Sequence, residues 1–164
     1  MTSGDEAVPR GPLVVGLGSP DRGDDAVGAA VVRAVDALGL PGVQVIEHED
    51  PTGLIDLWDG RDLAVVVDAV VSGGVPGALH VLATGADAAP MTESSWASTG
   101  RGGTHAFGIA AAIELARALR RLPRRLVVVG VEAGGFEYGA PLTPPVSAAV
   151  RDAVAQVLAE LNGE

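Results

Sequence analysis

The stretch "PLVVGLGSPDRGDDAVGAAVVRAVDAL", residues 12–38, joins an apolar run to a helical pattern through a glycine-rich turn. The apolar run, Pro12–Gly18, lacks the polar alternation of a half-exposed strand, so it predicts a strand covered on both faces. From Asp24 onward, apolar residues recur at helical spacing. That stripe consists of Val27, Val31, Val35 and Leu38. Strand, turn and helix in this order are typical of the first half of a βαβ unit.

The rest of the chain repeats this alternation. Further strands are predicted at residues 63–71 and 125–132, with shorter ones at 43–47 and 78–82. Helices are predicted at residues 104–122 and 144–161, with a short one at 52–58. The only long loop expected is 83–103. We therefore predict an α/β fold: a single doubly wound, mostly parallel twisted sheet of about five strands, with helices on both faces.

Length and composition limit what the protein can be. The 164 residues predict one domain, residues 11–164, after a short disordered tail, residues 1–10. The chain has no Cys, and its eleven basic residues are all Arg, which excludes thiolate chemistry, a lysine Schiff base and the P-loop lysine. A formal charge of −10 opposes binding to nucleic acid. No apolar run is long enough to span a membrane, and no secretory signal is visible, so we expect a cytoplasmic protein.

One run, "RALRRLPRR" at residues 117–125, is strongly basic and straddles the end of a predicted helix. Arginines there can complement the negative end of the helix dipole. The alternative is a surface patch for an acidic partner.

The glycine-rich turn has two readings. Gly16 and Gly18 begin the dinucleotide fingerprint G-x-G-x-x-G, but Asp21 stands at the third glycine position. Glu47 or Glu49 could hold a ribose, so a small nucleotide-binding protein remains one alternative. Against it, Asp21, Asp24 and Asp25 crowd the place where a diphosphate would lie, and carboxylates there would repel it.

The other reading is a metal site. Asp25 lies in the first turn of the helix after the first strand, Asp68 interrupts a buried strand, and His105 opens a later helix. In parallel sheets all three positions face the carboxyl edge of the strands, where ligands bind. Two carboxylates and one imidazole suit Zn, Ni, Mn or Fe, with coordination positions left open for catalysis.

Each of these residues also has a purely structural interpretation. Asp25 can complement the helix dipole, Asp68 can cap a loop, and a histidine at a loop–helix junction is often structural. Asp24 is expected to be the helix cap. His48 and His80 are expected to be structural residues at a strand end and on an edge strand.

Four segments in this order resemble the hydrogenase maturation proteases, which trim the C-terminal extension of the [NiFe]-hydrogenase large subunit. They are "VVGLGSPDRGDDAVG", "VVVDAVVSGGVPGALHVL", "THAFGIAAAIELARAL" and "RLVVVGVE…PLTPPVSAAV". The resemblance runs from about residue 13 to residue 161. The order of the four segments is more specific than any one of them. It implies a twisted α/β sheet with flanking helices.

The resemblance also implies a site. In the family, an acidic residue after the glycine turn, an aspartate ending a central strand and a histidine opening a helix bind nickel. Carried over, these are Asp25, Asp68 and His105, as both metal ligands and catalytic residues. The nickel would arrive with the hydrogenase precursor. This chain departs from the family with Ser19 where Asn is common, with Asp25 where Glu is frequent, and with a longer approach, "STGRGGTH", to the histidine.

The resemblance thus implies a metal-dependent, aspartyl-type endopeptidase with a [NiFe]-hydrogenase large-subunit precursor as its partner. The residues leave open which carboxylate acts as general base. They also leave the oligomeric state open, with a monomer as one option. A non-cleaving, metal-sensing chaperone or checkpoint on the same fold is the alternative from another functional class.

Overall fold

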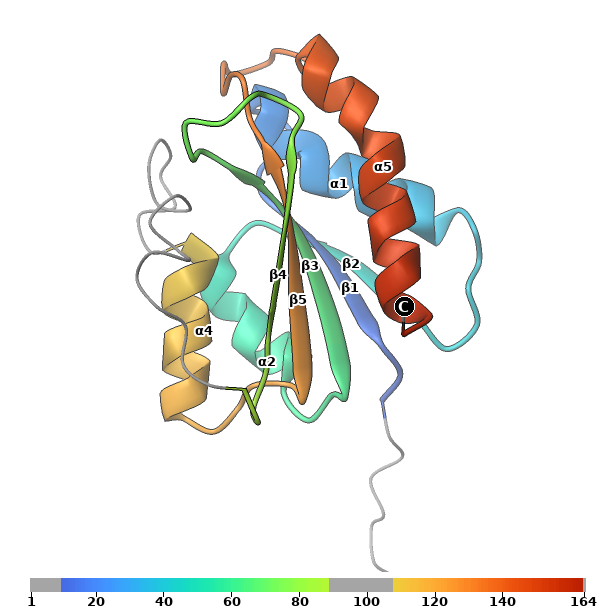
Figure 1. Ribbon diagram of the computed structural model, residues 1–164, viewed down its shortest axis with the longest axis vertical. Coiled ribbons are helices and arrows are strands. Elements are labelled where there is room, and N and C mark those ends of the chain that lie inside the picture. Colours follow the sequence, from blue (N-terminus) through green and yellow to red (C-terminus); the bar gives the residue numbers. More distant parts are fainter. Residues whose placement is uncertain (1–9, 89–107, 164) are drawn as a thin grey trace, which may run out of the picture.

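The computed structural model describes residues 10–88 and 108–163 (Figure 1). Five strands form one sheet in the order β2-β1-β3-β5-β4. The first four are mutually parallel, and β4 pairs antiparallel with β5 at one edge. The strands are β1 (Leu13–Leu17), β2 (Gln44–His48), β3 (Leu63–Val70), β4 (Leu79–Thr84) and β5 (Arg125–Glu132). The predicted doubly wound, mostly parallel sheet is confirmed.

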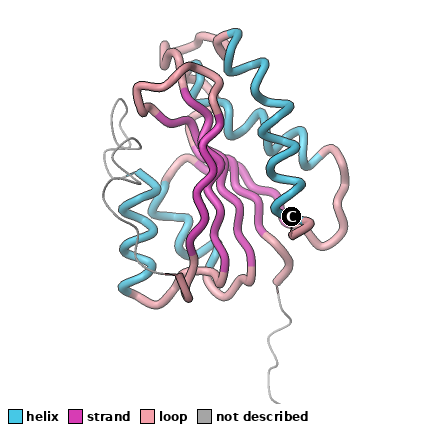
Figure 2. The backbone as a smooth tube through the Cα atoms, viewed as in Figure 1, coloured by secondary structure: helices cyan, strands magenta, loops and turns pink. Residues whose placement is uncertain are grey.

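Helices cover both faces of the sheet (Figure 2). They are α1 (Val27–Asp36), α2 (Leu54–Trp58), α4 (Gly108–Ala118) and α5 (Pro144–Leu161), with short 3₁₀ turns η1 (Gly23–Ala26) and η2 (Pro51–Gly53). Alternate strand residues face opposite layers. Val14 and Val65 pack with α1 and α5, whereas Val15 and Val66 pack with α2 and α4. The continuous apolar runs of the strands are therefore explained by burial on both sides.

Most predicted elements lie within two residues of their observed ends, and the differences have local causes. The first helix begins as the 3₁₀ turn η1 and ends at Asp36, so Leu38 is 54% exposed instead of buried. Helix α4 ends at Ala118, before the predicted Leu122, because Arg120 adopts a left-handed φ of 57°. Strand β4 extends to Thr84, into the predicted loop 83–103. Most of that loop, from residue 89, lies outside the described residues.

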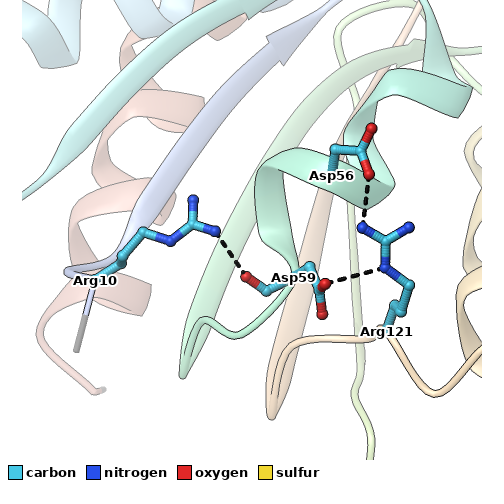
Figure 3. A network of polar contacts seen from close by, with 4 residues as sticks. All are labelled: Arg10, Asp56, Asp59 and Arg121. Atoms are coloured by element: carbon cyan, nitrogen blue, oxygen red, sulfur yellow. Dashed lines mark hydrogen bonds and ion pairs between the residues drawn. The ribbon is translucent and has the colours of Figure 1, made fainter. Parts of the chain in front are cut away.

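The amino edge of the sheet is held by arginines (Figure 3). Arg121 forms ion pairs with Asp56 at 2.6 Å and with Asp59 at 3.0 Å. Arg10, predicted to belong to the disordered tail, donates to the backbone carbonyl of Asp59 at 3.1 Å; residues 1–9 lie outside the described residues. Arg125 likewise pairs with Glu160 at 2.8 Å. The basic run at 117–125 thus pairs largely with acids of its own chain, which neither of its two sequence interpretations anticipated.

Among the described residues, no helix combines the length and the apolar character needed to cross a bilayer.

Candidate active site

The direction in which successive strands are added to the sheet reverses at β1. The chain leaves β1 toward β2 on one side and later returns to β3 on the other side of β1. This reversal is a topological switch point, where parallel α/β sheets bind their ligands. Asp25 follows β1 through η1, and Asp68 lies near the end of β3. The fold therefore brings these two predicted site residues to the same edge of the sheet.

Asp25 is held by the glycine turn that precedes it. Its side chain is 5% exposed, and its Oδ2 atom accepts a hydrogen bond from the Ser19 backbone N–H at 2.8 Å. Gly18 has a φ of 121°, and a Cβ atom there would lie 2.8 Å from Asp25 Oδ1. Only glycine leaves room for the turn to wrap this closely around the carboxylate.

Asp68 lies near the end of β3, in register with Gly130 of β5. Burial, together with the neighbouring Asp25 carboxylate, raises the pKa of Asp68 to about 8. A carboxyl group whose pKa is raised by burial and by a second carboxylate is a candidate functional residue.

The third predicted ligand, His105, lies outside the described residues, three positions before α4 begins. Within residues 10–88 and 108–163, no three His, Cys, Asp or Glu side chains gather closely enough to hold a metal ion. The structure thus brings together Asp25 and Asp68, and the complete three-residue site stays a prediction.

Asp24 does not cap a helix, and that prediction is wrong. The cap position of η1 is Arg22, and no side chain caps the turn. The Asp24 carboxylate is fully buried and accepts four hydrogen bonds from the loop that joins β5 to α5. The donors are the backbone N–H groups of Gly134 at 2.7 Å, Gly135 at 3.1 Å and Thr143 at 2.7 Å, and the Thr143 hydroxyl at 2.7 Å. These tertiary donors replace the local ones that the sequence suggested.

Glu132 at the end of β5 was not predicted as a functional residue. Its side chain is 1% exposed and accepts hydrogen bonds from the backbone N–H and hydroxyl of Ser72 and from the Gly74 N–H. It fixes the β3–β4 loop at the same edge of the sheet. An acid at the carboxyl end of a buried strand, like Asp68, was the available sequence signal.

An open cleft of about 370 Å³ adjoins the glycine turn. Its lining residues are Gly18, Pro20, Glu47, His48, Glu49 and Asp50. His48 therefore contributes to the cleft beyond its predicted place at a strand end, whereas His80 lies on the edge strand β4 as predicted. This volume lies within the usual range of ligand-binding clefts.

The nucleotide alternative loses support from the turn itself. The Ser19 backbone N–H, which a phosphate would need, already donates to Asp25. Glu47, a candidate for holding a ribose, pairs with Arg33 at 2.7 Å. The Ser19 N–H of the turn therefore binds a carboxylate of its own chain, Asp25.

Comparison with known proteins identifies the family. A family described as "Hydrogenase maturation protease" matches residues 41–160, which is more than half of the chain and includes Asp68. The chain belongs to this family. It is 31% identical over 154 residues to the hydrogenase 2 maturation protease of Escherichia coli strain K12, covering 92% of this chain and 90% of that protein.

Solved structures agree with this family assignment. The hydrogenase maturating endopeptidase HybD from E. coli superposes with a TM-score of 0.77 at 27% identity, covering 93% of each chain. A solution structure of an endopeptidase from E. coli gives a TM-score of 0.79 at 28% identity, again covering 93% of each. A maturation protease from Thermococcus kodakarensis, at 22% identity and a TM-score of 0.68, shares the fold. The family and the fold implied by the sequence are both confirmed.

Proposed function

We propose that this maturation protease removes the C-terminal extension of a [NiFe]-hydrogenase large-subunit precursor after the precursor has been loaded with nickel. The observation that carries the proposal is the interaction of the Asp25 carboxylate with Asp68 at the carboxyl edge of β1 and β3, in a chain from this family. The names of its relatives support the class of substrate.

The donor set fits nickel that arrives with the precursor. Asp25 and Asp68 offer carboxylate oxygens, His105 would add an imidazole, and the chain has no thiolates that would bind a metal permanently. A pair of repelling carboxylates gains stability from a cation placed between them. Such a weak, open site can report whether the precursor is loaded.

The two aspartates and the cleft beside the glycine turn then have separate tasks. Asp25 and Asp68 hold the nickel-bearing end of the precursor and are the two candidates for the base that takes a proton from the attacking water. A cation held there would supply Lewis-acid polarisation of the scissile carbonyl. The cleft beside Gly18 and Pro20 receives the chain next to the cleaved bond.

The test is cleavage of a purified precursor, prepared with and without nickel, by four full-length proteins. We expect the wild type and the control Asp62→Asn, which alters an exposed surface aspartate, to cleave only the loaded precursor. Asp68→Asn and His105→Ala should lose at least about a hundredfold in rate, as expected for removal of an electrostatic catalytic group. Cleavage by both variants at the wild-type rate would overturn the proposal. Binding of the precursor without cleavage by the wild type would instead establish the checkpoint alternative.

A further inference from the structure

Asp24 links the turn that carries Asp25 to the beginning of α5, over a hundred residues away in sequence. All four hydrogen bonds to its buried carboxylate come from three residues: Gly134, Gly135 and Thr143. The Asp24 backbone N–H donates in return to the Gly135 carbonyl at 2.9 Å. Figure 1 shows the β5–α5 connection and the start of α1 at the same end of the sheet. The two segments are therefore joined by both the side chain and the backbone of one residue.

The hydroxyl of Thr143 bonds to Asp24 and does not cap α5. Thr143 occupies the N-cap position of α5, where a threonine hydroxyl ordinarily accepts from an N–H of the first turn. Here no side chain caps the helix, and the Thr143 hydroxyl donates to Asp24 instead. Pro144 and Pro145 follow, and because proline has no N–H, they reduce the number of helix donors that need a cap.

Neighbouring residues of η1 point to opposite sides. Asp24 reaches the β5–α5 loop, whereas Asp25 turns back to the Ser19 N–H and stands beside Asp68. Asp24 and Asp25 are adjacent in a turn of only four residues, so a shift of the Asp24 backbone also shifts the backbone of Asp25.

We propose that Asp24 is a positioning residue of the active site: bonded to Gly134, Gly135 and Thr143, it fixes η1 so that the Asp25 carboxylate is held on the Ser19 N–H beside Asp68. The role of this arrangement in catalysis rests on the proposed function. The hydrogen bonds of Asp24 and Asp25 do not depend on that function.

Glu132 provides a matched control. It is also a buried carboxylate at the carboxyl edge, and it also binds backbone N–H groups of a loop, residues 72–74. No hydrogen bond joins it to the turn at residues 18–25 in the described part of the chain. Glu132→Gln should therefore lower stability in the same manner as Asp24→Asn without moving Asp25.

The experiment measures amide hydrogen exchange by NMR on the full-length, metal-free protein. The Ser19 N–H reports the Asp25 carboxylate directly, and the Val65 and Val66 amides in β3 report global opening. After correction for global opening, we expect Ser19 to exchange at least about tenfold faster in Asp24→Asn than in the wild type. Glu132→Gln should leave the corrected Ser19 rate unchanged.

Thr143 keeps the test decisive if Asp24→Asn does not fold. Thr143→Val removes one of the four donors and should produce a smaller change of the same sign, and Thr143→Ser, which keeps the hydroxyl, should restore the wild-type rate. Unchanged Ser19 exchange in both Asp24→Asn and Thr143→Val would overturn the proposal, as would an equal acceleration in Glu132→Gln.

Calorimetric titration with Ni²⁺ completes the comparison. We expect Asp24→Asn to bind Ni²⁺ at least about tenfold more weakly than Glu132→Gln does, because the oxygen donors must be preorganised. If Ser19 responds but Asp68→Asn still cleaves the precursor normally, the proposed function fails while the positioning role stands. If Asp68→Asn is inactive and Ser19 does not respond, the positioning role alone fails.

Discussion

Asp68 interrupts the apolar run of β3. A negative charge at this position costs free energy, because apolar surroundings solvate it poorly. In the metal-free protein, burial and the Asp25 carboxylate raise the pKa of Asp68 to about 8, compared with 3.8 for an unperturbed aspartate. The folded state holds this proton up to about pH 8, whereas the unfolded chain releases it near pH 4. Protonation thus favours the folded state, and the stability that it contributes is present below pH 4 and is lost as the pH rises to 8.

Asp68→Asn should remove this pH dependence. The difference in unfolding free energy between the variant and the wild type should grow in favour of the variant from pH 5 to pH 8, by up to about 1.4 kcal/mol per pH unit. Denaturant unfolding of both metal-free proteins at pH 5, 6.5 and 8 measures it, with Asp62→Asn as the exposed control. A difference that stays constant over this range would show that Asp68 is ionised in the folded state.

The sequence predicted that Asp25 and Asp68 lie at the same edge of the sheet. It did not predict the hydrogen-bond partners of Asp24. Asp68 could be identified because a carboxylate inside an apolar run needs a special reason. Asp24 looked like a cap because capping is a local interaction that can be seen in neighbouring residues. Its actual donors, Gly134 and Thr143, are brought to it by the fold and leave no local trace.

The first helix shows how an element is fitted to the sheet. Gly28 lies inside α1, where glycine lowers helix stability by about 1 kcal/mol relative to alanine. A Cβ atom at Gly28 would lie 2.5 Å from the Leu17 carbonyl oxygen and 2.7 Å from the Val67 carbonyl oxygen. The helix therefore touches the backbone of two strands at this residue. Gly28 thus fills the helix–sheet packing role of the dinucleotide fingerprint's third glycine, whose place in the pattern Asp21 occupies.

Gly28→Ala should consequently destabilise the protein, although helix propensity alone predicts the reverse. We expect a loss of about 2 kcal/mol, typical of overpacking against atoms that cannot move aside. Ala34→Gly, at an exposed position of the same helix, is the control and should cost about 1 kcal/mol. Thermal or denaturant unfolding measures both. A Gly28→Ala protein as stable as the wild type would mean that α1 can shift away from β1 and β3.

The elements themselves were largely predictable, because most are defined by patterns within their own residues. The run at residues 125–132 and the helix at 144–161 have the predicted ends. The sequence could not show that β4 runs antiparallel, since its direction depends on pairing with β5 across the sheet. It also could not place the end of α4. The left-handed conformation that follows this helix is usually adopted by glycine, but here it is adopted by Arg120.

The charged groups at the two edges of the sheet are arranged in different ways. At the amino edge, Arg121 compensates Asp56 and Asp59, and opposite charges lie side by side (Figure 3). At the carboxyl edge, by contrast, the Asp25 carboxylate opposes ionisation of Asp68. The first arrangement favours the folded chain, and the second costs free energy that a bound cation would recover.

Substitutions at the two edges should therefore have opposite consequences in the metal-free protein at pH 8. Arg121→Gln should lower the denaturant midpoint slightly, since it removes two partly exposed ion pairs, and should leave Ni²⁺ affinity unchanged. Asp25→Asn should raise the midpoint, because it removes the repulsion at Asp68 while its amide oxygen still accepts from Ser19, and it should weaken Ni²⁺ binding at least about tenfold. Unfolding curves and Ni²⁺ titrations of both variants measure these effects. Loss of Ni²⁺ affinity in Arg121→Gln, or destabilisation by Asp25→Asn, would show that the two edges are coupled and that Asp25 contributes to the fold as well as to the site.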